Sequence, residues 1–207
     1  MKPTSQPHDD KQALRIIACR IFRPALEYLD LQSRYPDVHM TYLPPTLHLR
    51  ADELTRNLRR EITKARRANE SIICLYGDCF PGIGDYCLSN GATKVPGPHC
   101  WEMLLGSERF QHLMDEVAGT YFVEQELILN FEKYCIEPLE LHDAEMREYC
   151  FKHYHRVVYV RQPSDPDLAM KPVELARFLG LSLETHDADY SHLDRRITGL
   201  ICIGKGL

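Results

Sequence analysis

Three cysteines and one histidine stand in loops or turns that follow short apolar runs of this sequence. Thiolate and imidazole groups bind soft metal ions, and a thiolate is also a nucleophile. A buried core needs no cysteine in a glycine- or proline-rich turn, whereas a metal site or a reactive thiol does. These candidate residues are Cys19, His48, Cys79 and Cys100.

The elements that must position them alternate between strand and helix. Apolar runs predict strands at 14–18, 37–43, 71–76 and 92–95. Strands in such a strand–helix–strand order form a parallel sheet, and their carboxyl ends lie on one side of it. The candidates can therefore converge although they are far apart in the sequence. Such a Cys3His set suits zinc or an iron–sulfur cluster.

Other readings of these residues stay open. The thiols could be unconnected residues at loop starts, and Cys87 or His99 could replace one of the ligands. Cys19 and Cys100 also precede predicted helices, where the positive end of the helix dipole favours thiolate. The remaining cysteines lie within apolar or amphipathic segments and are predicted to be small buried residues; they are Cys74, Cys135, Cys150 and Cys202.

The rest of the chain continues the same alternation. Further strands are expected at 119–123, 156–160, 181–185 and 200–203, with 156–160 in the centre of a sheet. Helices are expected from Pro24 to about Arg34, at 51–69, with a buried stripe, and at 172–179, where Gly180 ends the helix. We predict an α/β Rossmann-like fold, with a mostly parallel sheet flanked by helices. Residues 13–207 form a single domain with a possible sub-lobe from about residue 120, after a disordered tail at 1–12.

Composition excludes several classes of protein. The net charge of -5 argues against nucleic acid as a partner, and the arginines of 56–67 fit a solvated helix face. No apolar run approaches the roughly 20 residues of a membrane span. The polar N-terminus lacks a signal-peptide core, so a cytoplasmic protein is expected, with its eight cysteines as thiols or ligands. The common nucleotide-binding and Cys-x-x-Cys motifs are absent from the sequence.

Four segments of the sequence carry a family resemblance. They read IACRIFRPALEYL, LHLRADEL, LYGDCF and PHCWEMLLGS. Together they resemble DUF1638, a bacterial and archaeal family of unknown function often found beside corrinoid methyltransferase systems, over roughly residues 14–160. The family has a His-Asp pair before its last cysteine, where this chain has Pro98-His99, so we favour His48 over His99 as a ligand.

The resemblance implies a shared Cys/His site and further residues around it. Arg23, Tyr76 and Gly77 match family positions and are taken as cofactor-binding residues. Trp101 is added as a possible wall of a cofactor pocket, against the alternative of ordinary packing. The expected protein binds zinc or an iron–sulfur cluster, and a corrinoid protein or methyltransferase is the implied partner.

The reaction and the oligomeric state stay open at this point. One alternative is a non-enzymatic adaptor or chaperone that holds a metal or cluster for a partner protein. Another is a thiol redox protein without a metal. In a catalytic version, a thiolate bound to zinc accepts a methyl group.

Overall fold

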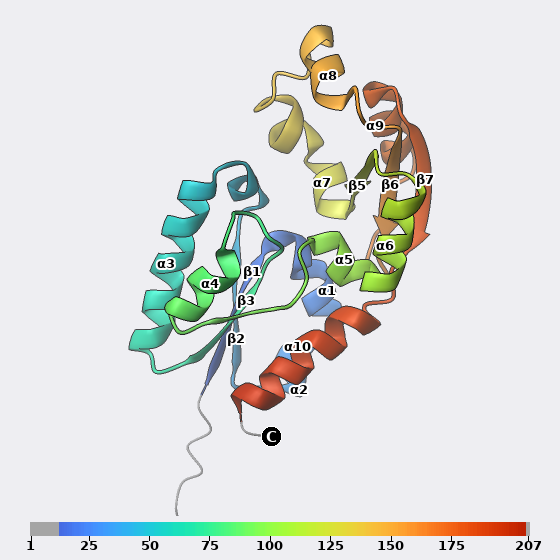
Figure 1. Cartoon of the computed structure of the whole chain (residues 1–207). Helices are drawn as coiled ribbons and strands as arrows, with labels where there is room; N and C mark the ends of the chain where they lie inside the picture. Colours follow the sequence, from blue (N-terminus) through green and yellow to red (C-terminus); the bar gives the residue numbers. More distant parts are fainter. Residues whose placement is uncertain (1–12, 206–207) are drawn as a thin grey trace, which may run out of the picture.

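The computed structural model describes residues 13–205 and shows two parallel sheets flanked by helices (Figure 1). In the first sheet the strand order is β2-β1-β3-β4. Its strands are β1 (Leu14–Cys19), β2 (Val38–Leu43), β3 (Ser71–Leu75) and β4 (Thr93–Lys94). The predicted α/β fold with Rossmann-like parallel strands is confirmed.

The connections of the first sheet are helical, as parallel pairing requires. After β1 come η1 (Arg20–Phe22), α1 (Arg23–Tyr28) and α2 (Leu31–Arg34). After β2 come η2 (Pro45–Leu49) and α3 (Ala51–Arg67). Helix α4 (Ile83–Ser89) joins β3 to β4.

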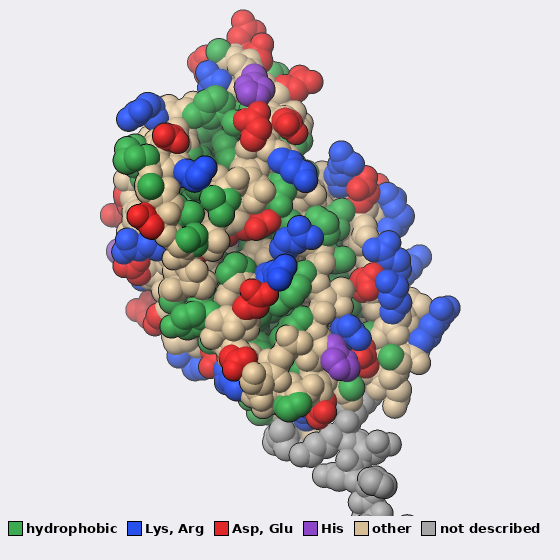
Figure 2. Space-filling view, turned by 180° about the vertical axis from the view of Figure 1, so that it is seen from behind, with side chains coloured by type: hydrophobic (Ala, Val, Ile, Leu, Met, Phe, Trp, Pro, Cys, Tyr) green, Lys and Arg blue, Asp and Glu red, His purple; other side chains and the backbone are tan. Residues whose placement is uncertain are grey.

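Helix α3 shows how side-chain spacing fixes a face. Its buried residues recur at helical spacing and are Leu54, Leu58, Ile62 and Ala65, the stripe predicted from the sequence. The basic residues occupy the opposite face, and Figure 2 shows Lys and Arg side chains gathered along the edge where α3 lies. Lys64 and Arg60 both form ion pairs with Glu61 at 2.9 Å, as expected for the solvated helix face predicted from the sequence.

The second sheet has the order β5-β6-β7 and is also parallel. Its strands are β5 (Thr120–Val123), β6 (Arg156–Arg161) and β7 (Ser182–Asp187), so β6 is central as predicted. Helices α5 (Cys100–Leu105) and α6 (Ser107–Glu116) lead into it. Within it lie α7 (Gln125–Leu129), the π-helical turn η3 (Glu132–Ile136), α8 (Ala144–Phe151) and α9 (Lys171–Leu179), which ends at left-handed Gly180.

Arg156 ties the second sheet to the helix before it. Its buried guanidinium donates to Thr120 Oγ1 at 2.9 Å, to the Leu113 carbonyl at 2.7 Å and to the carboxylates of Glu116 and Glu184. These partners belong to β5, α6 and β7, so one side chain joins three elements to β6. A buried charge requires such a full set of partners.

The last helix returns to the first sheet. Helix α10 (Ser191–Gly204) leaves the second sheet after β7 and packs its buried residues Leu193, Ile197 and Ile201 into the first core. Lys205 Nζ lies 3.2 Å from Asp37 Oδ2, just before β2. Figure 1 shows α10 running back beneath the second sheet to the first. The final helix therefore belongs to the core built by the first half of the chain.

Two expectations about elements were wrong, and one helix was not expected. Residues 200–203 form the end of α10 rather than a strand, because the apolar residues 193, 197 and 201 repeat every four positions. Residues 83–89 form a helix that the glycines at 82 and 84 masked. The expected helix from Pro24 to Arg34 is broken at Asp30, whose φ of 48° is left-handed.

The N-terminal tail predicted at 1–12 lies outside the described residues. Across residues 13–205, none of the helices combines the length and the apolar character that crossing a bilayer demands.

Candidate thiol and histidine site

The carboxyl ends of β1 and β3 place the first candidates side by side. The two strands are parallel neighbours, and Ala18 is paired with Leu75. Cys19 is the last residue of β1, and Tyr76 directly follows β3, so the two residues lie at the same edge of the sheet. Both side chains are almost completely buried, with Cys19 7% exposed and Tyr76 2% exposed.

Gly77 allows two loops to meet at this edge. A Cβ atom on Gly77 would lie 2.7 Å from the Pro98 carbonyl oxygen and 3.2 Å from the Cys100 nitrogen, which is too close for a side chain. The next residue, Asp78, donates its N–H to the same Pro98 carbonyl at 2.6 Å. The missing side chain thus lets the segment carrying Cys100 pack against the turn carrying Cys79.

Cys79 lies at the centre of the cluster. Its sulfur accepts a hydrogen bond from the Cys100 thiol and another from the His48 imidazole, and these bonds, aided by the charge of Lys94, lower the pKa of Cys79 to about 5. The same hydrogen bond raises the pKa of His48. Cys79 is partly exposed and His48 is exposed, so solvent reaches the pair. Cys79 has the character of an accessible thiolate.

The other two thiols have the opposite character. Burial raises the pKa of Cys19 to about 12, against a hydrogen bond from the Ile21 N–H that lowers it. Donation to Cys79 and burial raise the pKa of Cys100. Burial at Cys19 and donation at Cys100 therefore favour the neutral thiols, against the thiolates that the helix starts would favour. The Cys79 sulfur also raises the pKa of Cys19, which places the three thiols in one electrostatic cluster.

The four candidate ligands thus share one edge, but they do not enclose an ion. Within residues 13–205, no group of three or more His, Cys, Asp or Glu side chains is arranged to hold a metal ion. What the structure brings together is a thiolate with two hydrogen-bond donors, and a third thiol nearby.

The remaining predicted residues take different places. Arg23 is exposed, pairs with Glu27 at 2.7 Å and lies over the Tyr42 ring. The Trp101 ring stacks on Phe122 of β5, with ring centroids 6.0 Å apart, and packs against the first core.

The two reserve ligands are occupied elsewhere. The His99 ring packs on Phe110, with centroids 5.1 Å apart. Cys87 is fully buried and hydrogen-bonded to Cys74.

Sequence reasoning missed the polar residues at the carboxyl edge of the second sheet. Glu124 directly follows β5 and is 1% exposed, and its two carboxylate oxygens accept the N–H groups of Glu126 and Leu127 at 2.7 and 2.8 Å. Burial raises the pKa of Glu124 to about 8. Glu124 in turn raises the pKa of Cys19, so the two edges lie within electrostatic reach. The sequence did contain a signal for Glu124, because this polar residue directly follows a predicted strand.

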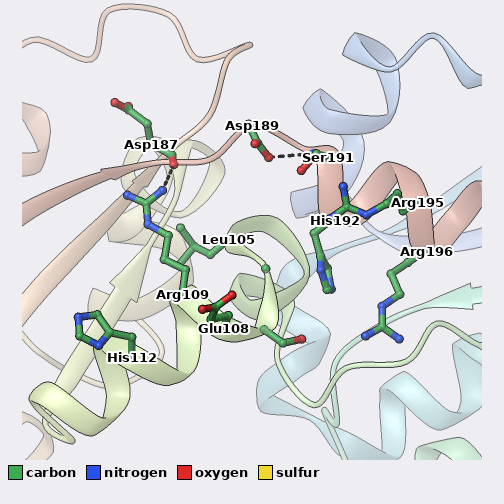
Figure 3. Close-up of a pocket in the computed structure, with 12 residues that line it drawn as sticks. Leu105, Glu108, Arg109, His112, Asp187, Asp189, Ser191, His192, Arg195 and Arg196 are labelled. Atoms are coloured by element: carbon green, nitrogen blue, oxygen red, sulfur yellow. Dashed lines mark hydrogen bonds between the residues drawn. The ribbon is translucent and has the colours of Figure 1, made fainter.

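A surface pocket of about 620 Å³ lies away from these residues (Figure 3). It is lined by the start of α6 and the first half of α10, and includes Arg109, His192 and Arg195. Arg109 donates to the backbone carbonyl of Asp187, and Asp189 accepts the Ser191 N–H at 2.9 Å. The lining does not include Cys19, His48, Cys79 or Cys100.

The fold and the site together define an α/β protein with a partly buried cluster of thiols at the carboxyl edge of a parallel sheet. Its sequence matches the family described as "Protein of unknown function (DUF1638)" over residues 42–197. The chain belongs to this family. The match begins after β1, so it includes His48, Cys79 and Cys100 but not Cys19, whereas the expected resemblance began at residue 14.

Searches of curated proteins and of solved structures found no match to this chain.

Proposed function

We propose that this DUF1638 protein binds one soft metal ion through Cys19, His48, Cys79 and Cys100. The convergence of three thiols and one imidazole at one sheet edge is the observation that supports it. Thiolate and imidazole are the donors preferred by zinc and by iron–sulfur clusters. Because the side chains do not enclose an ion in the present arrangement, binding requires them to close around it.

The thiol protonation states set the order of binding in this proposal. Among the three proposed thiol ligands, Cys79 is the first to bind because its pKa is lowered, to about 5. Cys19 and Cys100 must lose protons to bind, and a bound cation provides the charge that makes this favourable. Metal affinity should therefore rise with pH.

In the catalytic version of the proposal, a metal-bound thiolate accepts a methyl group. The sulfur lone pair forms the S–CH3 bond while the donor's bond to that carbon breaks, and the electron pair leaves with the donor. The partner class is a corrinoid protein or methyltransferase, which rests on the family resemblance alone. The location that suits this site is the cytoplasm, where a reducing environment keeps thiols free.

A metal-free dithiol is the second candidate, and the Cys79–Cys100 hydrogen bond favours it. The accessible thiolate would attack an external disulfide, and Cys100 would then displace the mixed disulfide as the resolving thiol. One disulfide forms in the protein while the external disulfide is reduced to two thiols.

Metal analysis of anaerobically purified protein distinguishes the two candidates. We expect about one zinc ion per chain, or iron with sulfide and visible absorbance, and we expect Cys79→Ala to lose most of it. Cys74→Ala is the matched control, because Cys74 is also a buried thiol but bonds Cys87 rather than Cys79. Its metal content should equal that of the parent.

Protein without metal that readily forms a Cys79–Cys100 disulfide with oxidised glutathione would reject the metal site and support the dithiol. Equal metal loss in Cys79→Ala and Cys74→Ala would reject the assigned ligands.

A further inference from the structure

The Tyr76 hydroxyl is a buried polar group that the ligand set proposed above does not use. Tyr76 is 2% exposed, and its Oη atom has no hydrogen-bond partner among residues 13–205. A buried hydroxyl almost always has a partner, because burial without one costs the bonds that it makes to water. The position of this hydroxyl therefore requires an explanation.

The pairing of β1 with β3 places Tyr76 beside the thiols. The residues just before Cys19 and Tyr76 are paired in the parallel sheet, so the side chains of Cys19 and Tyr76 share the other face of that sheet. The sulfurs of Cys19, Cys79 and Cys100 all lie within electrostatic reach of the Tyr76 hydroxyl. The unpaired hydroxyl thus belongs to the same edge as the proposed ligands.

Two of the three sulfurs have a backbone donor that metal binding would leave in place. The Ile21 N–H bonds to Cys19, and the Gly77 N–H bonds to Cys100. A metal-bound thiolate keeps lone pairs that accept such hydrogen bonds, and these bonds orient the ligand and tune the metal. Cys19 and Cys100 are therefore supplied with a donor in the metal-bound site.

Cys79 is the sulfur that would lose its donors. It now accepts from the His48 imidazole and from the Cys100 thiol, and both groups are ligands in the proposed site. The Cys100 thiol gives up its proton when it binds the ion, and the His48 nitrogen turns its lone pair to the ion. A new donor is then needed at Cys79.

The nearest ammonium group is already occupied. Lys94 contributes to the lowered pKa of Cys79 through its charge. Its Nζ donates to the carbonyl oxygens of Val95 and Gly97 at 3.3 and 2.8 Å, and lies 3.0 Å from Asp78 Oδ1. The three protons of an ammonium group are engaged by these partners, so Lys94 has none left for a sulfur.

We propose that Tyr76 is a positioning residue of the metal site, and that its hydroxyl donates a hydrogen bond to the metal-bound sulfur of Cys79. This role rests on the proposed function, because it adds a residue to that same site. The bond forms as the side chains close around the ion, and it gives the Tyr76 hydroxyl its partner. Tyr76 acts on the metal through the Cys79 sulfur and is not itself a ligand.

Titration of the full chain with zinc and with cobalt(II) tests this role in Tyr76→Phe, which removes a single oxygen atom. We expect the variant to bind one ion per chain with an affinity at least about tenfold below that of the parent, measured by competition with a chelator. Loss of a hydrogen bond raises the energy of the sulfur lone pairs. The thiolate-to-cobalt charge-transfer band should therefore move to longer wavelength.

Tyr190→Phe is the matched control. Tyr190 is also fully buried, but its hydroxyl bonds Gln162 and Ser164, which follow β6. This variant should lose stability and yet keep the zinc affinity and the cobalt spectrum of the parent. Metal-free Tyr76→Phe should be at least as stable as the metal-free parent, which separates weaker metal binding from a disturbed fold.

Equal zinc affinity and an unchanged cobalt spectrum in Tyr76→Phe would overturn the role of Tyr76 and leave the metal site standing. Weaker binding together with a loss of metal-free stability would also overturn it, because that pattern marks a packing role. A parent that binds neither ion would overturn it as well. If the anaerobically purified parent is also free of metal, the proposed function fails with it.

Discussion

At the scale of single residues, the ionisation of Cys79 is the property most open to test. Its thiolate accepts from Cys100 and His48, which lowers its pKa to about 5. In metal-free protein, alkylation of Cys79 by iodoacetamide should therefore rise with pH around 5 and be level at neutral pH. The alkylation rate of an ordinary thiol would instead rise around pH 8.5.

Removing one hydrogen-bond donor from Cys79 should shift the pH dependence of its alkylation. His48→Ala deletes a hydrogen bond and a nearby positive charge, so the midpoint should shift to higher pH. Rates measured by mass spectrometry on the Cys79 peptide check both statements, with Cys79→Ser as the blank. A parent midpoint near 8.5, or a His48→Ala profile identical to the parent's, would contradict the assigned contacts.

Two buried tyrosines offer a second residue-scale prediction. Tyr76 Oη is buried without a partner, whereas Tyr159 Oη donates to Asp165 at 2.6 Å. Tyr76→Phe should raise the free energy of unfolding by about 1 kcal/mol, because an unpaired polar atom is removed from a buried site. Tyr159→Phe should lower it by about 1–2 kcal/mol, because Asp165 loses a donor.

Denaturant unfolding monitored by circular dichroism gives both values. Loss of stability in Tyr76→Phe comparable to that in Tyr159→Phe would mean that the Tyr76 hydroxyl has a partner after all.

At the scale of elements, Gly77 controls how the turn after β3 meets the segment before α5. Gly77→Ala should force Pro98 and Cys100 away, since the added Cβ would lie 2.7 Å from the Pro98 oxygen. The variant should lose about 2 kcal/mol of stability and raise the pH midpoint of Cys79 alkylation, because Cys100 moves off the thiolate.

Gly84→Ala is the matched control for this element. Gly84 lies in α4, and nothing stands within 4 Å of its added Cβ. That variant should be neutral or more stable, since alanine favours helix by up to about 1 kcal/mol. A Gly77→Ala protein as stable as Gly84→Ala, with an unchanged Cys79 profile, would show that the close approach is not needed.

Elements with a regular apolar repeat could be predicted from the sequence, and elements defined by tertiary contacts could not. The stripe of α3 and the end of α9 at Gly180 follow from local spacing and backbone preference. The run at 200–203 was read as a strand because short apolar runs fit either structure; its place against the first core decides for helix.

The site divides in the same way. Cys19, Cys79 and Cys100 could be found because each follows a predicted strand, and the parallel order of strands is inferable. Which thiol ionises could not be predicted, because burial of Cys19 and the bonds to Cys79 depend on side-chain packing. The contacts of Gln162 and Asp165 could not be predicted either, because they depend on a second sheet whose orientation no local pattern reveals.

At the scale of the whole molecule, α10 joins the two halves of the chain. It leaves the second sheet and buries Ile197 completely in the first core, and Arg34 of α2 pairs with Asp194 of α10 at 2.8 Å. A first half without this helix would expose the apolar face that Leu193, Ile197 and Ile201 cover. The single domain predicted for residues 13–207 should therefore unfold as one cooperative unit.

Two probes can follow this unfolding together. Circular dichroism reports all the helices, and fluorescence reports Trp101, the one tryptophan of the chain, which stacks on Phe122 where the sheets meet. Both signals should give the same midpoint in the parent protein.

Ile197→Ala should lower the free energy of unfolding by about 3 kcal/mol in both signals, because it opens a cavity in the shared core. Ile203→Ala is the control on the same helix, and because Ile203 is 76% exposed its effect should stay within about 0.5 kcal/mol. Separate midpoints for the two signals, with only one of them moved by Ile197→Ala, would show instead that the sheets unfold independently.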